Sequence, residues 1–218
     1  MFPLYDTTPR KRFPFMNYLL IAINIYAFYL QLTAADIEGF TTAYSFIPRQ
    51  FHLYDIYSYQ MIITSIFLHG SLFHIASNMW FLHIFGDNVE DTFGHIGYLL
   101  FYVAAGIIAT LTQYVFDPTS VIPLIGASGA ISGVAGAYFV LFKYSKVRTI
   151  VPIFIVFSLV DIPVWLFLGY WFFIQLFSGL GSLASLDAQY GGIAFLAHVG
   201  GFIFGYLYTK TLYSGDEM

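Results

Sequence analysis

The chain contains no cysteine, and this absence excludes a zinc site built on thiolates. It also means that the sequence carries no sign of its redox compartment. Charge is scarce as well, because only 9% of the 218 residues are Asp, Glu, Lys or Arg, against roughly 25% in soluble domains. The composition therefore argues against an ordinary soluble protein.

Hydrophobic residues are abundant, at 59% of the chain, and the mean hydropathy is +0.75. A membrane-spanning helix needs about 20 apolar residues, and six such helices fit this chain. We predict an all-α polytopic membrane protein with one six-helix membrane domain at 13–212. Residues 1–12 and 213–218 are expected to form short tails.

Six apolar segments are the expected spans. They cover 14–32, 61–85, 96–116, 126–143, 163–180 and 192–212. The first is not expected to be a cleaved signal, because no small-residue cleavage site follows it. The apolar segment 149–161 is too short to add a span to the fifth, and we expect it to be interfacial or irregular.

The basic residues predict the orientation of these spans. With six spans and a cytoplasmic N-terminus, only Arg49 of the eight basic residues falls outside. Such a bias is typical of cytoplasmic loops. Both termini are therefore predicted to be cytoplasmic, and an odd number of spans would put Lys210 outside.

Residues 126–137 are almost all Gly, Ala or Ser, and Ser128 stands between two glycines. Such a face allows a second helix to pack closely. A serine at the start of a helix also has free backbone N–H groups beside it, as a nucleophile requires. Helix packing and catalysis both remain open from this segment alone.

His198 lies in the sixth span, where Gly201 and Gly205 form a GxxxG surface. Under the predicted orientation, Ser128 and His198 both lie near the outer ends of their spans. A serine and a histidine on two closely packed helices make a plausible nucleophile and base. Because the sixth span has no carboxylate near His198, we expect a dyad rather than a triad.

The second span contains further polar side chains that are unusual in an apolar helix. His74 and Asn78 are four residues apart and share a helix face. Both can donate a hydrogen bond, and with the Ser128 N–H they could hold an oxyanion.

Three segments together resemble the rhomboid family of intramembrane serine proteases. These segments are HGSLFHIASN at 69–78, GASG at 126–129 and AHVGGFIFG at 197–205. They occur in the family's order on the second, fourth and sixth predicted spans, and the resemblance covers the whole six-span core. It implies a rhomboid-like bundle.

The resemblance also implies a role for each matching residue. Ser128 would be the nucleophile and His198 the general base. The oxyanion hole would consist of His74, Asn78 and the Ser128 N–H.

The remaining matches would have supporting roles. Gly126 would shape the turn before the nucleophile, His69 would be structural or organise water, and Glu90 would brace the cytoplasmic side. Gly201 and Gly205 would allow close helix packing.

Two positions depart from the family pattern. Tyr59-Gln60 stands where many members have Trp-Arg in the first outer loop, and Ser132 stands where some have a tyrosine that stacks on the histidine. Neither change removes a catalytic group, so we expect an active enzyme. Another group must then position His198.

The sequence thus favours a serine endopeptidase that cleaves transmembrane substrates near the outer face of the bilayer. We expect no cofactor, no metal and no nucleic-acid partner, and a prokaryotic inner membrane as the location.

The absence of an HExxH motif argues against a metalloprotease. Two alternatives are a small transporter, which predicts internal repeats that are not found, and a non-catalytic adaptor that binds transmembrane helices and tolerates loss of Ser128.

Overall fold

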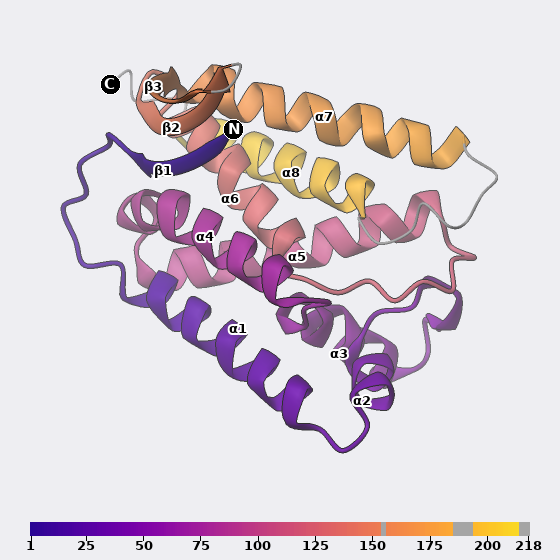
Figure 1. Cartoon of the computed structure of the whole chain (residues 1–218). Helices are drawn as coiled ribbons and strands as arrows, with labels where there is room; N and C mark the ends of the chain where they lie inside the picture. Colours follow the sequence, from indigo (N-terminus) through magenta and orange to yellow (C-terminus); the bar gives the residue numbers. More distant parts are fainter. Residues whose placement is uncertain (154–155, 185–193, 214–218) are drawn as a thin grey trace.

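The computed structural model describes residues 1–153, 156–184 and 194–213, and most of these residues are helical (Figure 1). The α-helices are α1 (Phe15–Thr33), α2 (Ile37–Tyr44), α3 (Ile56–Thr64), α4 (Leu72–Phe93), α5 (His95–Phe116), α6 (Ser128–Leu141), α7 (Val164–Ala184) and α8 (Phe195–Tyr213). Two short 3₁₀ turns are η1 (Pro48–Gln50) and η2 (Ser65–Phe67), and the strands are β1 (Phe2–Asp6), β2 (Lys146–Ile153) and β3 (Val156–Pro163).

Three helices are long and apolar enough to cross a membrane in the described part of the chain. They are α1, α5 and the stretch Val164–Gly181 of α7, which confirms long apolar helices at the predicted first, third and fifth spans. Helix α6 is apolar but has only 14 residues. Most residues of the predicted site lie on α4, α6 and α8, whereas His69 and Gly126 lie just before α4 and α6.

The predicted second span, 61–85, is wrong at its start. Helix α3 ends at Thr64, η2 follows, and α4 begins only at Leu72. Ser71 explains the new start, because its side chain accepts a hydrogen bond from the His74 N–H as an N-cap. The break also leaves the Ser65 carbonyl free to accept a hydrogen bond from the Gly126 N–H at 2.9 Å.

The purely α-helical prediction is also wrong, because the described residues include an antiparallel sheet in the order β1-β2-β3. It takes in residues 2–6 of the predicted tail and most of the segment predicted to be irregular. Val147 and Thr149 are fully buried on one face of β2, while Arg148 forms an ion pair with Asp161 on the other. This alternation, with β-branched residues inside, favours a strand.

Helices α1 and α4 run antiparallel, and hydrogen bonds join them at one end of α4 and just before its other end. At one end, the buried Glu90 carboxylate accepts hydrogen bonds from the N–H groups of Met16 (2.9 Å) and Asn17 (2.7 Å). These N–H groups lie in the first turn of α1 and have no acceptor within the helix. At the other end, the Gln31 side chain accepts a hydrogen bond from the His69 N–H at 3.1 Å.

Strand β1 is tied to the helices through Asp6. Its carboxylate accepts hydrogen bonds from the Asn88 side chain of α4 and from the Tyr138 hydroxyl of α6. Thr8 adds a hydrogen bond to the Tyr138 hydroxyl at 2.6 Å. The start of the chain therefore holds α4 and α6 together at the end of α6 away from Ser128.

Helices α6 and α8 pack in parallel with their backbones in contact. A Cβ atom on Gly201 would lie 2.2 Å from the Gly129 carbonyl oxygen, and one on Gly205 would lie 1.9 Å from that of Gly133. Only residues without a side chain allow this approach. Figure 1 shows α6 between α4 and α8, so α8 is fixed against the helix at the centre of the bundle.

Gly205→Ala should destabilise the bundle by about 1–3 kcal/mol, because the added methyl group meets backbone that cannot turn away. The measurement is the thermal unfolding midpoint of the purified protein in detergent. Gly181→Ala in α7 is the matched control, since nothing lies within 4 Å of its added Cβ atom. Equal midpoints for the two variants would contradict the close α6–α8 contact.

Candidate active site

Ser128 is the first residue of α6, and an extended segment leads to it. Hydrogen bonds fix this segment on both sides: Leu124 exchanges two with Phe46, at 2.8 and 3.2 Å, and Gly126 donates to the Ser65 carbonyl. Gly126 has a φ angle of +124°, which only glycine adopts without strain. The turn therefore places Ser128 at a helix start whose first N–H groups are free of intrahelical bonds.

The His198 side chain faces Ser128 from the first turns of α8. Its Nε2 atom lies 2.7 Å from the Ser128 Oγ atom. The Gly201–Gly129 contact fixes the spacing of the two helices one turn further along. The serine hydroxyl and the imidazole therefore meet in hydrogen-bond geometry, although they are far apart in the sequence.

His74 and Asn78 lie on the same face of α4, beside the turn at Gly126. A Cβ atom on Gly126 would lie 2.8 Å from His74 Nε2 and 3.7 Å from Asn78 Nδ2. The Gly70 N–H donates to His74 Nδ1 at 3.4 Å, so the ring proton is on Nε2. Two side-chain N–H donors thus lie next to the backbone that leads into Ser128.

His69 supports this pair. Its Nε2 atom lies 3.1 Å from Asn78 Nδ2, and its ring packs edge-on to that of His74, with centroids 5.0 Å apart. His69 is 1% exposed. It therefore contacts the two donors and not Ser128.

A cavity of about 220 Å³ opens beside the Ser128–His198 pair. Helices α4, α6, α7 and α8 line it, and its polar side chains include those of Asn78, Ser128, Gln175 and His198. A segment of an extended peptide chain can enter a space of this size. The reactive side chains are then on the wall of a cavity inside an otherwise apolar bundle.

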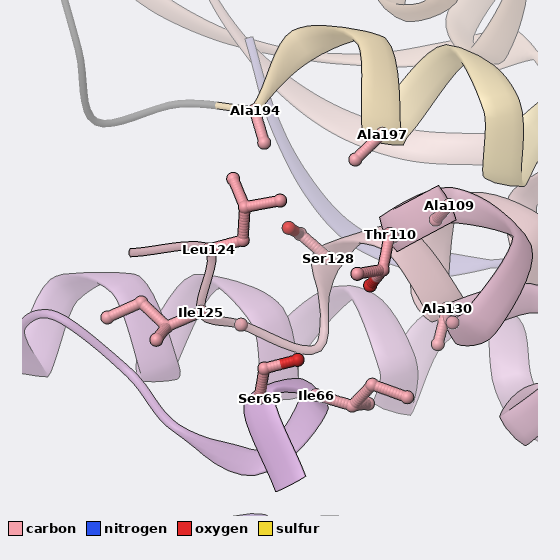
Figure 2. A pocket seen from close by; sticks show the side chains of 13 residues that line it. Ser65, Ile66, Ala109, Thr110, Leu124, Ile125, Ser128, Ala130, Ala194 and Ala197 are labelled. Carbon is pink, nitrogen blue, oxygen red and sulfur yellow. The ribbon is translucent and has the colours of Figure 1, made fainter. Parts of the chain in front are cut away.

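A second, smaller pocket of about 30 Å³ adjoins Ser128. Figure 2 shows it between Ser65 and Ile66 of η2 and Ala194 and Ala197 near the start of α8. The volume is close to that of one water molecule, and hydroxyl groups of Ser65 and Ser128 are among its polar atoms. A water could therefore be held beside the serine.

The structure brings together most of the residues that the sequence singled out. Ser128, His198, His74, Asn78 and Gly126 form one group. Glu90 is at the far end of α4, about 24 Å from His74 along the helix. Ser132 turns away from the histidine, because its hydroxyl donates to the Ser128 carbonyl at 2.6 Å.

Sequence reasoning missed Gln175 and Trp171, both on α7. The Gln175 Oε1 atom lies 2.7 Å from His198 Nδ1, and the Trp171 ring packs against the imidazole with centroids 6.0 Å apart. The available signal was the amide itself, since a polar side chain in an apolar span points to a function.

This arrangement fits acyl transfer to a serine. An activated hydroxyl, a base and a set of N–H donors are the parts that such a reaction requires. Across the described ranges, no group of three or more His, Asp or Glu side chains is placed to hold a metal ion.

Comparison with known proteins gives a family match. The model of the Rhomboid domain matches residues 57–215, which is more than half of the chain. The chain is 35% identical over 124 residues to rhomboid protease GluP of Bacillus subtilis, covering 57% of this chain and 24% of that protein. It is 27% identical over 212 residues to mitochondrial rhomboid protein 1 of Saccharomyces cerevisiae, covering 95% of this chain and 55% of that one.

A third relative is the mitochondrial presenilin-associated rhomboid-like protein of Bos taurus, with 37% identity over 78 residues. The match covers 35% of this chain and 21% of the bovine protein. The matches therefore cover between 21% and 55% of the length of these relatives, which is less than two thirds in each case.

Gly126→Ala should slow the reaction of Ser128 with a fluorophosphonate probe by about 10- to 100-fold. The methyl group would push on His74, and the backbone would leave its positive φ angle, so the donors and the hydroxyl would lose their alignment. The measurement is the labelling rate, with the site identified by mass spectrometry. Gly70→Ala is the control, because its added Cβ meets only ordinary contacts at 3.7 Å or more; equal slowing in both variants would contradict the argument.

Proposed function

The chain belongs to the rhomboid family, and we propose that it is an intramembrane serine endopeptidase in which Ser128 is the nucleophile and His198 the base. One observation carries the proposal: the Ser128 hydroxyl lies 2.7 Å from His198 Nε2 at a helix start, beside the donors of His74 and Asn78. Family membership and three long apolar helices make it an integral membrane protein.

The proposed reaction begins with acylation of Ser128. The Ser128 oxygen attacks the carbonyl carbon of the scissile bond, and His198 Nε2 takes the hydroxyl proton. The negative charge on the carbonyl oxygen is held by the Ser128 N–H, His74 Nε2–H and the Asn78 amide. His198 then gives its proton to the leaving amine, and the C–N bond breaks to leave an acyl-enzyme.

Water completes the cycle. A water molecule attacks the ester carbon while His198 takes one of its protons. Collapse of the intermediate returns that proton to the Ser128 oxygen and releases the carboxylic acid. The small pocket supports this step, because it can hold a water molecule next to the nucleophile.

Membrane-anchored proteins are the proposed substrates. The larger cavity lies within a helical bundle, so a substrate reaches it from the bilayer. A peptide bond inside a helix is shielded, and its N–H and C=O groups are bonded. Substrates should therefore unwind near the cut, and segments with helix-weakening residues there should be preferred.

Six spans and two cytoplasmic termini form part of the proposal. Helix α4 lies antiparallel to α1, with its C-terminal part at the start of α1 and the segment before it at the end of α1, so it crosses the bilayer if α1 does. Strand β1 pairs with β2, which puts residues 2–6 and 146–153 on one side and requires an even number of crossings between them. Helices α1, α4, α5 and α6 give four, and α7 and α8 complete six.

The side with both termini is proposed to be the cytoplasm, because it holds seven of the eight basic residues under this arrangement. The active site then opens toward the outer side. A prokaryotic inner membrane is the proposed location.

Single cysteines test this topology, since the natural chain has none. Tyr54→Cys and Tyr144→Cys replace exposed side chains, on the two proposed sides of the membrane. In intact bacterial cells, an impermeant maleimide should label Cys only in the Tyr54 variant, and opening the inner membrane should expose the second site. The cysteine-free parent gives the background, and equal labelling of the two variants in intact cells would rule out the proposed topology.

Cleavage of a single-span model substrate in liposomes tests the chemistry. The wild-type protein should cut it, and Ser128→Ala and His198→Ala should each lower the rate at least about 1,000-fold. Ser132→Ala, one turn along the same helix, is the control and should keep most of the activity. Persistent cleavage by Ser128→Ala would defeat the mechanism, whereas binding of the substrate without any cleavage by the wild type would replace the protease with an adaptor.

A further inference from the structure

The base of the proposed site has a partner on its other nitrogen. We propose that Gln175 is a positioning residue for His198 and extends the dyad to a Ser–His–Gln chain; this inference rests on the proposed function. The juxtaposition comes from α7, which places the Gln175 Oε1 atom 2.7 Å from His198 Nδ1. On the opposite nitrogen, His198 Nε2 lies 2.7 Å from the Ser128 Oγ atom.

The chemistry of the amide determines what this contact does. A carbonyl oxygen only accepts hydrogen bonds, so Nδ1 must carry the proton of the neutral imidazole. Nε2 then has a free lone pair directed at the Ser128 hydroxyl, as a base requires. The reverse orientation of the amide would place an N–H on Nδ1 and a proton on Nε2, and the serine would lose its acceptor.

Burial makes the contact persistent. Gln175 and His198 are both 9% exposed, so water does not compete freely for either group. A buried polar group without a partner costs free energy, and each group here satisfies the other. Breaking the pair would leave two unsatisfied groups in an apolar bundle.

Trp171 acts from the same helix. It precedes Gln175 by four residues, so both side chains leave one face of α7. Its ring packs on the imidazole at 6.0 Å with an angle of 33° between the planes. Helix α7 therefore holds the ring by one nitrogen and one face, while Ser132 of α6 bonds to backbone.

A neutral acceptor suits this location better than a carboxylate. An aspartate would orient the imidazole and stabilise its charged form, but a buried carboxylate is costly when the base is neutral. Glutamine gives orientation without that cost. In this chain the amide therefore fixes the tautomer and the direction of the base, and adds no charge.

Gln175→Met tests the role, because methionine has a similar size and no amide. We expect kcat for the model substrate to fall about 10- to 100-fold while KM changes little, since the loss concerns alignment for the chemical step. Gln175→Glu keeps an acceptor at the same reach and should retain a higher kcat than Gln175→Met, although the buried carboxylate lowers stability. Thermal unfolding midpoints establish that both variants are folded.

Gln113→Met is the matched control. Gln113 is also an amide that contacts α8, but its Oε1 atom accepts from the Ala197 N–H at 3.3 Å and not from the imidazole. It should leave kcat within about twofold of the wild type. Equal losses in the two methionine variants would show that amides merely support α8, and would overturn the positioning role.

Nitrogen NMR of ¹⁵N-histidine-labelled protein gives a readout that needs no substrate. The His198 signals are identified among those of six histidines by their absence in His198→Ala. The wild type should show the Nδ1–H tautomer, and Gln175→Met should shift the population toward Nε2–H. A wild-type ring protonated on Nε2 would refute the inference, whereas lack of cleavage with the expected tautomer would defeat only the proposed function.

Discussion

The backbone contact between α6 and α8 is the constraint on which the site depends. Ser128 and His198 stand on different helices, and their hydrogen bond forms only if the two axes approach more closely than side chains permit. Gly136, Gly201 and Gly205 allow this approach. Association of helices in lipid gains little from hydrophobic burial, so close packing of small residues supplies much of the stability. The same atoms therefore hold the bundle together and set the distance between hydroxyl and imidazole.

Around that contact, polar groups satisfy one another inside apolar surroundings. Glu90 binds the free N–H groups of α1, Asn78 bonds with His69, and Gln175 with His198. Each bond joins two elements, so it also fixes their relative position. The break after α3 also leaves a backbone group that joins two segments, because the Ser65 carbonyl accepts a hydrogen bond from the Gly126 N–H. Irregular segments in this bundle hold the reactive turn in place.

The sequence predicted the parts that depend on local composition. Long apolar runs predicted the helices at 15–33 and 95–116. The predicted orientation of the spans and the resemblance of three motifs to the rhomboid family grouped Ser128, His198, His74 and Asn78, which the structure brings together. The sequence did not predict the features that depend on contacts between distant segments. The break before α4 depends on the Ser71 cap, which an apolar average hides, and β2 needs β1 and β3 as partners. The role of Gln175 depends on its contact with His198 on α8, which the sequence alone does not reveal.

The pairing of β1 with β2 has a consequence for the order of folding. Phe2 pairs with Ile150, and helices α1 to α6 lie between them in the chain. Contacts between segments so distant in sequence form slowly, because a long loop must close first. While those helices insert, β1 has open backbone groups that could pair with another chain. Strand β1 precedes the helices in the chain but is therefore among the last elements to reach its native neighbours. It needs protection from aggregation until β2 has formed.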